Sequence, residues 1–159
     1  MSNLEVLVNA KNTSTYLANK QEIVPVNDEA ILLNVVDGDT FDVLVNDANI
    51  NMVRELRIRL SGINCPEMVR AAKPKPEKQQ QQLAAEHAKT QLTKLLNKYK
   101  SMTIKLGSLD NYGRHIADVK VNKGKIDVSQ FMIDNKYAQV YTGGSLKKVV
   151  YDLSQFNFN

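Results

Sequence analysis

The sequence is poor in the features that define several classes of protein. Its 159 residues include one cysteine, Cys65, so neither an internal disulfide nor a cluster of thiolate metal ligands can form. Its apolar runs are all shorter than the roughly 20 residues of a membrane-spanning helix, so we expect no membrane partner. Residues 1–5 lack the basic and then apolar order of a secretory signal. We therefore expect a cytoplasmic protein, or a secreted one if the sequence is a trimmed mature form.

What the sequence does have is enough apolar material for one domain and an uneven distribution of charge. Hydrophobic residues make up 43% of the chain, and the net charge is +4. Residues 1–67 carry a net charge of −5, residues 68–125 carry +9, and residues 126–159 are neutral. An acidic segment followed by a basic one indicates a cation site beside an anion-binding surface. Ordinary solvated faces are the alternative.

Apolar residues recur at strand and helix spacings along most of the chain. Runs or alternation of apolar residues predict five short strands, at residues 31–36, 40–45, 56–60, 102–106 and 116–121. Between the third and fourth strands, apolar residues at helical spacing predict a helix of about 20 residues that ends near Lys100. Asp127 is placed to cap a further short helix. This order is typical of an α+β fold built on a five-stranded OB-type β-barrel.

We expect three segments along the chain. Residues 1–30 are polar, with two short apolar bursts, and are interpreted as an N-terminal arm or edge strand. Residues 31–144 contain the predicted strands and helices and form the folded domain. Residues 145–159 follow two consecutive glycines and are interpreted as a C-terminal tail.

Two short motifs place carboxylates where they can take part in chemistry. Asp37 and Asp39 flank Gly38 in a turn between predicted strands, where two carboxylates can converge on a hard cation. An Asp-Gly turn without a metal is the alternative interpretation. Downstream, the rigid Pro66 precedes Glu67, and a glutamate beside a metal-bound water is the general-base arrangement of hydrolysis. A plain surface carboxylate is the alternative for this glutamate.

Two arginines add the complementary charge. Arg59 lies on a strand whose other face is apolar, and Arg114 follows an aromatic residue in the turn DNYGR. Two guanidinium groups that converge on one phosphate can stabilise the charge of a phosphoryl transition state, because each offers a planar pair of N–H donors. An ion pair between Arg59 and Glu55 is the alternative for the first arginine.

The order and spacing of these motifs resemble those of the staphylococcal (micrococcal) nuclease family. The resemblance covers residues 31–144 and rests on the series VVDGDT, RLSGINCPE, a long helix, DNYGR and a YTGG-type ending. It implies an OB-type barrel with about three helices and a calcium-dependent phosphodiesterase. The implied activity is that of an endonuclease that hydrolyses DNA and/or RNA with low sequence specificity and leaves 3′-phosphate ends.

The resemblance also implies roles for individual residues. The implied catalytic residues are Arg59, Glu67 and Arg114. The implied metal ligands are Asp39, Asn64 and the backbone carbonyl of Cys65, with Asp37 as a nearby or water-mediated partner. The expected substrate-binding residues are Tyr112, Asn111 and Tyr141. Of these, Tyr141 can stack on a base, and a place in the barrel core is its alternative.

Two positions depart from the family pattern. Asn64 stands where the best-known member has a second calcium-ligating aspartate. Its amide oxygen can still ligate, but the site loses one negative charge, so we expect weaker calcium binding or another divalent cation. Asn111 stands where the family has a lysine. A non-catalytic OB-fold module that binds nucleic acid or protein remains as the alternative function, although the complete set of acidic and arginine side chains favours the enzyme.

Overall fold

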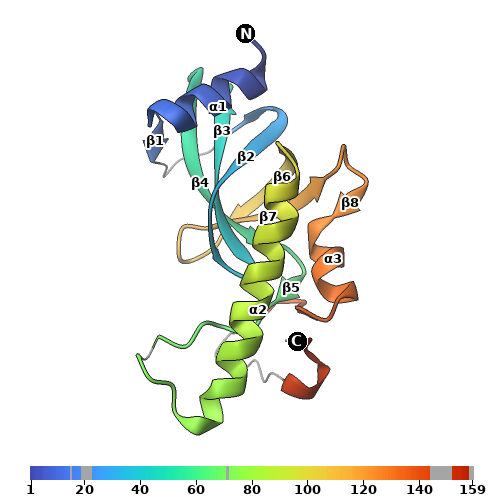
Figure 1. Ribbon diagram of the computed structural model, residues 1–159. Coiled ribbons are helices and arrows are strands. Elements are labelled where there is room, and N and C mark those ends of the chain that lie inside the picture. Colours follow the sequence, from blue (N-terminus) through green and yellow to red (C-terminus); the bar gives the residue numbers. More distant parts are fainter. Residues whose placement is uncertain (15, 19–22, 71, 144–151, 158–159) are drawn as a thin grey trace.

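The structure is a computed structural model that describes residues 1–14, 16–18, 23–70, 72–143 and 152–157. Its centre is a closed barrel (Figure 1) of the strands β2 (Pro25–Asp37), β3 (Thr40–Asp47), β4 (Met52–Leu60), β6 (Met102–Leu109) and β7 (His115–Val121). Strands β2, β3 and β4 form an antiparallel meander, and β6 pairs antiparallel with both β2 and β7. The parallel pairing of β4 with β7 closes the barrel. The predicted α+β fold with a five-stranded OB-type barrel is confirmed.

The barrel interior is filled by the alternating side chains of the strands. Phe41 and Val43 of β3 are fully buried and lie opposite Ile58 and Leu56 of β4. The long helix α2 (Pro76–Lys98) packs against β2 and adds its apolar stripe to the same core. This helix agrees with the predicted one in position and in its end near residue 100. The hydrophobic effect of this core is what holds the barrel end and its loops in place.

The C-terminal half adds a short helix where a capping residue predicted one. α3 (Val128–Asp134) begins after Asp127, whose side chain accepts a hydrogen bond from the backbone N–H of Gln130 at 2.9 Å. The helix buries Val128 and Met132 against the barrel core. Its N-terminal cap also belongs to the two-residue strand β8 (Ile126–Asp127), which pairs with β7. The helix is therefore fixed at both its cap and its apolar face.

A small second sheet ties the segment after β4 to the end of the fold. β5 (Ile63–Asn64) pairs antiparallel with β9 (Gln139–Val140), and the backbone N–H of Tyr141 donates to the carbonyl of Gly62 at 2.9 Å. This sheet fixes the course of the chain immediately before Cys65.

The described part of the predicted tail, residues 152–157, packs back onto the protein. It contains a 3₁₀ turn, η2 (Leu153–Gln155), and Phe156 is only 9% exposed. The backbone N–H of Asn157 donates to the carbonyl of Lys136 at 2.7 Å. Across the described residues, the helices are too short or too polar to cross a membrane.

The N-terminal segment is partly different from the expected arm or edge strand. Residues 3–13 form the helix α1 (Asn3–Thr13), which starts with a reciprocal capping box between Ser2 and Glu5. Its buried Leu7 packs with residues of β2, β3 and β4 in a second hydrophobic cluster on the outside of the barrel. Among the described residues before β2, β1 (Leu17–Ala18) is the part that behaves as an edge strand, paired in parallel with β4. The boundaries of the three segments stay a prediction.

Removal of the Leu7 side chain tests the contribution of α1. The residue is fully buried, so we expect Leu7→Ala to lower the free energy of unfolding by about 2–4 kcal/mol through lost apolar burial and a residual cavity. Val8→Ala on the same helix is the control, because Val8 is 41% exposed and its loss should be below about 1 kcal/mol. Urea denaturation measures both. Equal midpoints for Leu7→Ala and the wild type would show that α1 does not stabilise the barrel.

Candidate active site

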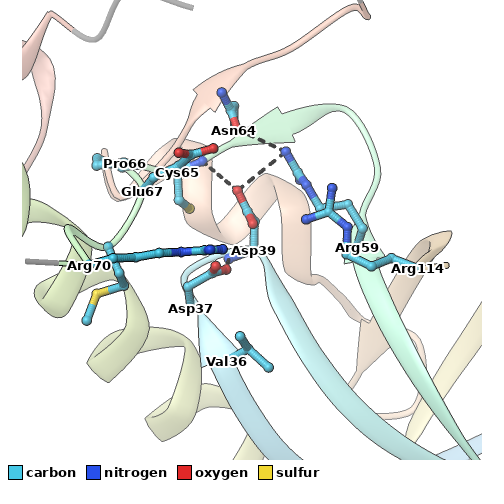
Figure 2. Close-up of a pocket in the computed structure, with 11 residues that line it drawn as sticks. Val36, Asp37, Asp39, Arg59, Asn64, Cys65, Pro66, Glu67, Arg70 and Arg114 are labelled. Atoms are coloured by element: carbon cyan, nitrogen blue, oxygen red, sulfur yellow. Dashed lines mark hydrogen bonds and ion pairs between the residues drawn. The ribbon is translucent and has the colours of Figure 1, made fainter. Parts of the chain in front are cut away.

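The residues expected from the motifs meet at one end of the barrel, where the β2–β3 turn, the end of β4 and the segment after β5 come together (Figure 2). They line a cavity of about 240 Å³. The predicted site residues in its lining are Asp37, Asp39, Arg59, Asn64, Cys65, Glu67 and Arg114. The fold therefore brings every residue that was expected to serve in catalysis or metal binding to one place, although their roles stay predictions.

The β2–β3 turn approaches the rest of the site closely because its second residue is glycine. A Cβ atom on Gly38 would lie 2.7 Å from Cβ of Ala88 in α2 and 2.9 Å from Sγ of Cys65. Atoms that are not bonded to each other do not approach so closely in a packed interior, so a side chain at this position would clash with both residues. The turn is thus wedged between α2 and the segment after β5, which fixes Asp37 and Asp39 relative to Cys65.

We expect Gly38→Ala to destabilise the protein by about 1–3 kcal/mol, because the added methyl group overpacks this junction. Ala88→Gly removes one of the two clashes at a helix-propensity cost of about 1 kcal/mol. The double variant should therefore lose less stability in urea denaturation than the sum of the two single variants. Additive losses, or an unchanged Gly38→Ala variant, would contradict the close approach.

Asp39 is the buried carboxylate of the cavity. Its Oδ2 accepts a hydrogen bond from the backbone N–H of Cys65 at 2.8 Å and lies 3.4 Å from Nη2 of Arg59. Its Oδ1 accepts a hydrogen bond from the hydroxyl group of Thr40 at 3.0 Å. Burial raises the pKa of Asp39 to about 6, against the lowering effect of Arg59 and with a further rise from Asp37. The protein therefore compensates the charge of this carboxylate only in part.

The raised pKa of Asp39 predicts how stability depends on pH in metal-free protein. Between about pH 4 and pH 6 the folded state holds the proton of Asp39 more tightly than the unfolded state, so the free energy of unfolding falls as pH rises. The loss from this group should reach up to about 3 kcal/mol, at 1.36 kcal/mol per pKa unit. We expect Asp39→Asn to lack this loss.

The measurement is urea denaturation of wild type and Asp39→Asn at pH 4, 5, 6 and 7 with chelator present. Relative to the wild type, the free energy of unfolding of Asp39→Asn should increase as pH rises from 4 through 6. A constant difference would show that Asp39 titrates in the folded protein as it does in an unfolded chain.

Arg59 is held by acceptors on several sides and is only 6% exposed. Its Nη1 donates to the carbonyl oxygens of Leu60 and Ile63, both at 2.9 Å. Its Nη2 donates to Oδ1 of Asn64 at 2.9 Å and forms the ion pair with Asp39. The ion-pair partner of this arginine is therefore Asp39 and not Glu55. The guanidinium joins the end of β4 to β5 and to the β2–β3 turn.

Glu67 differs from these groups because it is exposed at the cavity, directly after the buried Pro66. Two glutamines near the start of α2 hold its segment. Nε2 of Gln81 donates to the carbonyl oxygen of Glu67 at 3.0 Å, and Oε1 of Gln82 accepts from the backbone N–H of Val69 at 2.6 Å. The backbone around Glu67 is thus anchored while its carboxylate remains accessible to water.

Arg114 lies on the opposite side of the cavity and is braced by its own turn. Nε of Arg114 donates to Oδ2 of Asp110 at 2.6 Å, and the guanidinium lies 5.3 Å from the centre of the Tyr112 ring. Burial acts to raise the pKa of Asp110, but hydrogen bonds from the backbone and guanidinium of Arg114 lower it overall. The side chain of this arginine is 20% exposed, against 8% for Arg59. Arg114 is therefore oriented by a carboxylate that stays ionised, yet open to a ligand.

A second, more open cavity of about 530 Å³ adjoins the first. Residues that line both cavities are Val36, Asp37, Glu67, Arg70 and Arg114. The second cavity also includes Tyr112, which is 77% exposed and can stack on a base. Arg57 lines it too, but its guanidinium is occupied by a two-pronged ion pair with Asp42, at 2.8 and 3.1 Å.

Two expected substrate-binding residues line neither cavity, whereas a charged residue that the motifs did not indicate lines both. Asn111 is exposed in the turn before Tyr112, and Tyr141 is half-buried beside β9. Arg70, three residues after Glu67, was missed by the sequence analysis. It belongs to a segment rich in basic residues, and nothing in its spacing distinguishes it from the lysines that follow.

The donor atoms around the first cavity fit a hard divalent cation in kind. The carboxylates of Asp37, Asp39 and Glu67 and the amide of Asn64 offer oxygen ligands. In the described part of the chain, no three His, Cys, Asp or Glu side chains are grouped as a complete metal site, so backbone carbonyls, the amide and water would have to complete the coordination. The raised pKa of Asp39 supports a cation here, because added positive charge would stabilise the buried carboxylate.

Comparison with known proteins identifies one family. The family model described as staphylococcal nuclease homologue matches residues 57–155, which is more than half of the chain. The matched region contains Arg59, Asn64, Glu67 and Arg114, whereas the β2–β3 turn lies before it. No curated protein sequence matches the chain.

Proposed function

Because this chain belongs to the family of staphylococcal nuclease homologues, we propose that it is a metal-dependent endonuclease that hydrolyses DNA and/or RNA with low sequence specificity. The observation that carries the proposal is the single cavity lined by Arg59, Glu67, Arg114 and the buried Asp39. An accessible carboxylate beside two guanidinium groups suits the attack of water on a phosphodiester. The proposed products carry 3′-phosphate ends.

Glu67 is the proposed general base. Its exposed carboxylate can orient a water molecule and take its proton as the water oxygen attacks phosphorus. The bond from phosphorus to the 5′ oxygen then breaks, the 5′ oxygen takes up a proton from water, and the phosphate stays on the 3′ side. The anchored backbone of the segment limits the positions that the carboxylate can adopt, and such positioning is itself a source of rate.

The two arginines have different parts in the proposal. Arg114 uses Nε for Asp110, and within the described residues its Nη groups have no hydrogen-bond partner, so they can bind the phosphate and the departing oxygen. Arg59 uses its Nη groups to hold Asn64, Asp39 and two carbonyls, and its positive charge faces the same cavity. Arg59 therefore combines charge stabilisation with the positioning of the acidic residues.

The proposed metal ligands are Asp39, Asn64 and the backbone carbonyl of Cys65, with Asp37 nearby. When bound, a divalent cation, calcium by family resemblance, supplies further positive charge against the scissile phosphate. The amide of Asn64 contributes no charge, so we propose weak calcium binding or the use of another divalent cation.

The test is cleavage of single-stranded DNA, duplex DNA and RNA in calcium, magnesium, manganese or chelator. We expect cleavage in the presence of a divalent cation and none in chelator, and the products should carry 3′-phosphate ends. Cutting with magnesium or manganese but not calcium would assign the metal preference to the departure at Asn64. Salt-sensitive binding without cutting in any metal would overturn the enzyme and support the non-catalytic module.

The surface with which OB-fold binding modules usually contact nucleic acid is covered in this protein. OB-fold modules commonly bind oligonucleotides on the face of their second and third strands, which here are β3 and β4. Helix α1 covers that face, because Leu44 of β3 and Val53 of β4 are buried with Leu7 in the outer cluster. A nucleic acid is therefore expected at the cavities at the barrel end.

A further inference from the structure

Arg70 differs from the other arginines around the two cavities because, among the described residues, its guanidinium forms no ion pair with a carboxylate. Arg57, Arg59 and Arg114 each pair with an aspartate, at 2.8, 3.4 and 2.6 Å. In the part of the chain that the structure describes, no ion pair joins Arg70 to a carboxylate. An exposed guanidinium that forms no ion pair has its N–H donors available for an external anion.

The position of Arg70 connects the site of cleavage to the neighbouring cavity. Its side chain lines both cavities, and Figure 2 shows it extending toward Asp37 and Asp39 from the segment that follows Glu67. The larger cavity also contains the exposed ring of Tyr112. A strand with one phosphate between Glu67 and Arg114 can place its next nucleotide in this larger space.

The backbone that carries Arg70 is anchored, so its side chain starts from a defined place. The N–H of the preceding Val69 donates to Oε1 of Gln82 at 2.6 Å. The amide of Gln82 is oriented in turn by its Nε2, which donates to Oε1 of Glu86 at 2.6 Å. This chain of hydrogen bonds runs from α2 to the residue next to Arg70.

We propose that Arg70 binds the backbone phosphate adjacent to the one that is cleaved. The inference rests on the proposed function for the identity of the ligand as a nucleic acid. The planar fork of the guanidinium can hold two oxygens of one phosphate, which a lysine cannot do. Arg70 is thus a substrate-binding residue that sets affinity and the register of the strand, while Glu67, Arg59 and Arg114 act at the cleaved phosphate.

The test measures binding apart from cleavage. The probe is a fluorescent single-stranded oligodeoxynucleotide, titrated at several salt concentrations with chelator and in a Glu67→Gln background. Loss of one phosphate contact should reduce the slope of log affinity against log salt by about 0.7. We expect Arg70→Ala to show this reduction with roughly a tenfold weaker affinity at low salt, and Arg70→Lys to keep the slope with an intermediate affinity.

Lys94→Ala is the matched control, because it also removes one exposed positive charge but lies on α2 about 18 Å along the helix axis from Gln82. Its slope should equal that of the background protein. In the active protein, Arg70→Ala should raise KM about tenfold with kcat nearly unchanged. An unchanged slope and KM, or the same slope change in Lys94→Ala, overturns the proposal. Absence of cleavage in every metal would overturn the nuclease function alone, since the binding experiment does not depend on it.

Discussion

Glu67→Gln will lower the rate of cleavage about a thousandfold or more and leave the stability of the protein unchanged. The amide keeps the size and the hydrogen-bonding reach of the side chain but cannot accept the proton of the attacking water. A thousandfold loss corresponds to about 4 kcal/mol of transition-state stabilisation. Stability should be retained because the side chain is exposed and its segment is anchored through the backbone carbonyl.

The measurement is single-turnover cleavage at saturating protein, together with the urea midpoint of each protein. Glu77→Gln is the control for loss of an exposed carboxylate, because Glu77 lies in the first turn of α2 and lines neither cavity. Its rate should stay within a factor of a few of the wild type. Substantial activity in Glu67→Gln at wild-type stability would exclude this residue as the general base.

Arg59→Ala and Arg114→Ala will both reduce cleavage by about a thousandfold, but only the first will also destabilise the fold by several kcal/mol. Removal of Arg59 leaves the buried Asp39 without its cation and three oxygen acceptors without their donor. Breaking a buried pair in this way costs about 3–5 kcal/mol. Arg114 is paired in a partly exposed turn, so its removal should cost less than about 1 kcal/mol of stability.

The double variant Arg59→Ala/Asp39→Asn separates the cost of an uncompensated charge on Asp39 from the cost of the other contacts that Arg59 loses. If the destabilisation of Arg59→Ala comes from the uncompensated carboxylate, the second substitution should recover a large part of it at pH 7 and little at pH 4, where Asp39 is protonated. Urea denaturation at both pH values measures the recovery. Equal losses of stability for Arg59→Ala and Arg114→Ala would show that the buried contacts of Arg59 contribute nothing specific.

The barrel and the long helix were predictable because each carries an uninterrupted hydrophobic period. Phe41, Val43 and Val45 alternate along β3 without a break, and all three are buried. β2 begins six residues earlier than predicted. These residues were not recognised as part of a strand, because Asn27 and Asp28 adopt positive φ angles and the register with β3 shifts there. A local irregularity of this kind removes the alternation that a sequence pattern depends on.

Helix α1 and the residue Arg70 were not predictable for a different reason. The apolar residues of the N-terminal helix lie mostly in one short run, residues 4–8, and what holds the helix is the outer face of β2, β3 and β4, which the local sequence does not show. Arg70 is distinguished by its place between two cavities and by having no acidic partner in the described part of the chain, and both are properties of the assembled fold. In contrast, the acidic turn and the segment around Glu67 were predictable, because each is a short motif whose residues are adjacent in the sequence.

The pairing of β4 with β7 and of β5 with β9 has a consequence for the newly made chain. Ile58 pairs with His115, and Asn64 pairs with Gln139, so the site depends on strands that are translated long after it. Contacts over such sequence separations form late, because a large loop must close before they can stabilise anything. A ribosome that has released only the first hundred residues therefore carries all the acidic groups of the site but no assembled cavity. The cavity, and with it the proposed cleavage activity, should therefore form only after β9 has emerged from the ribosome.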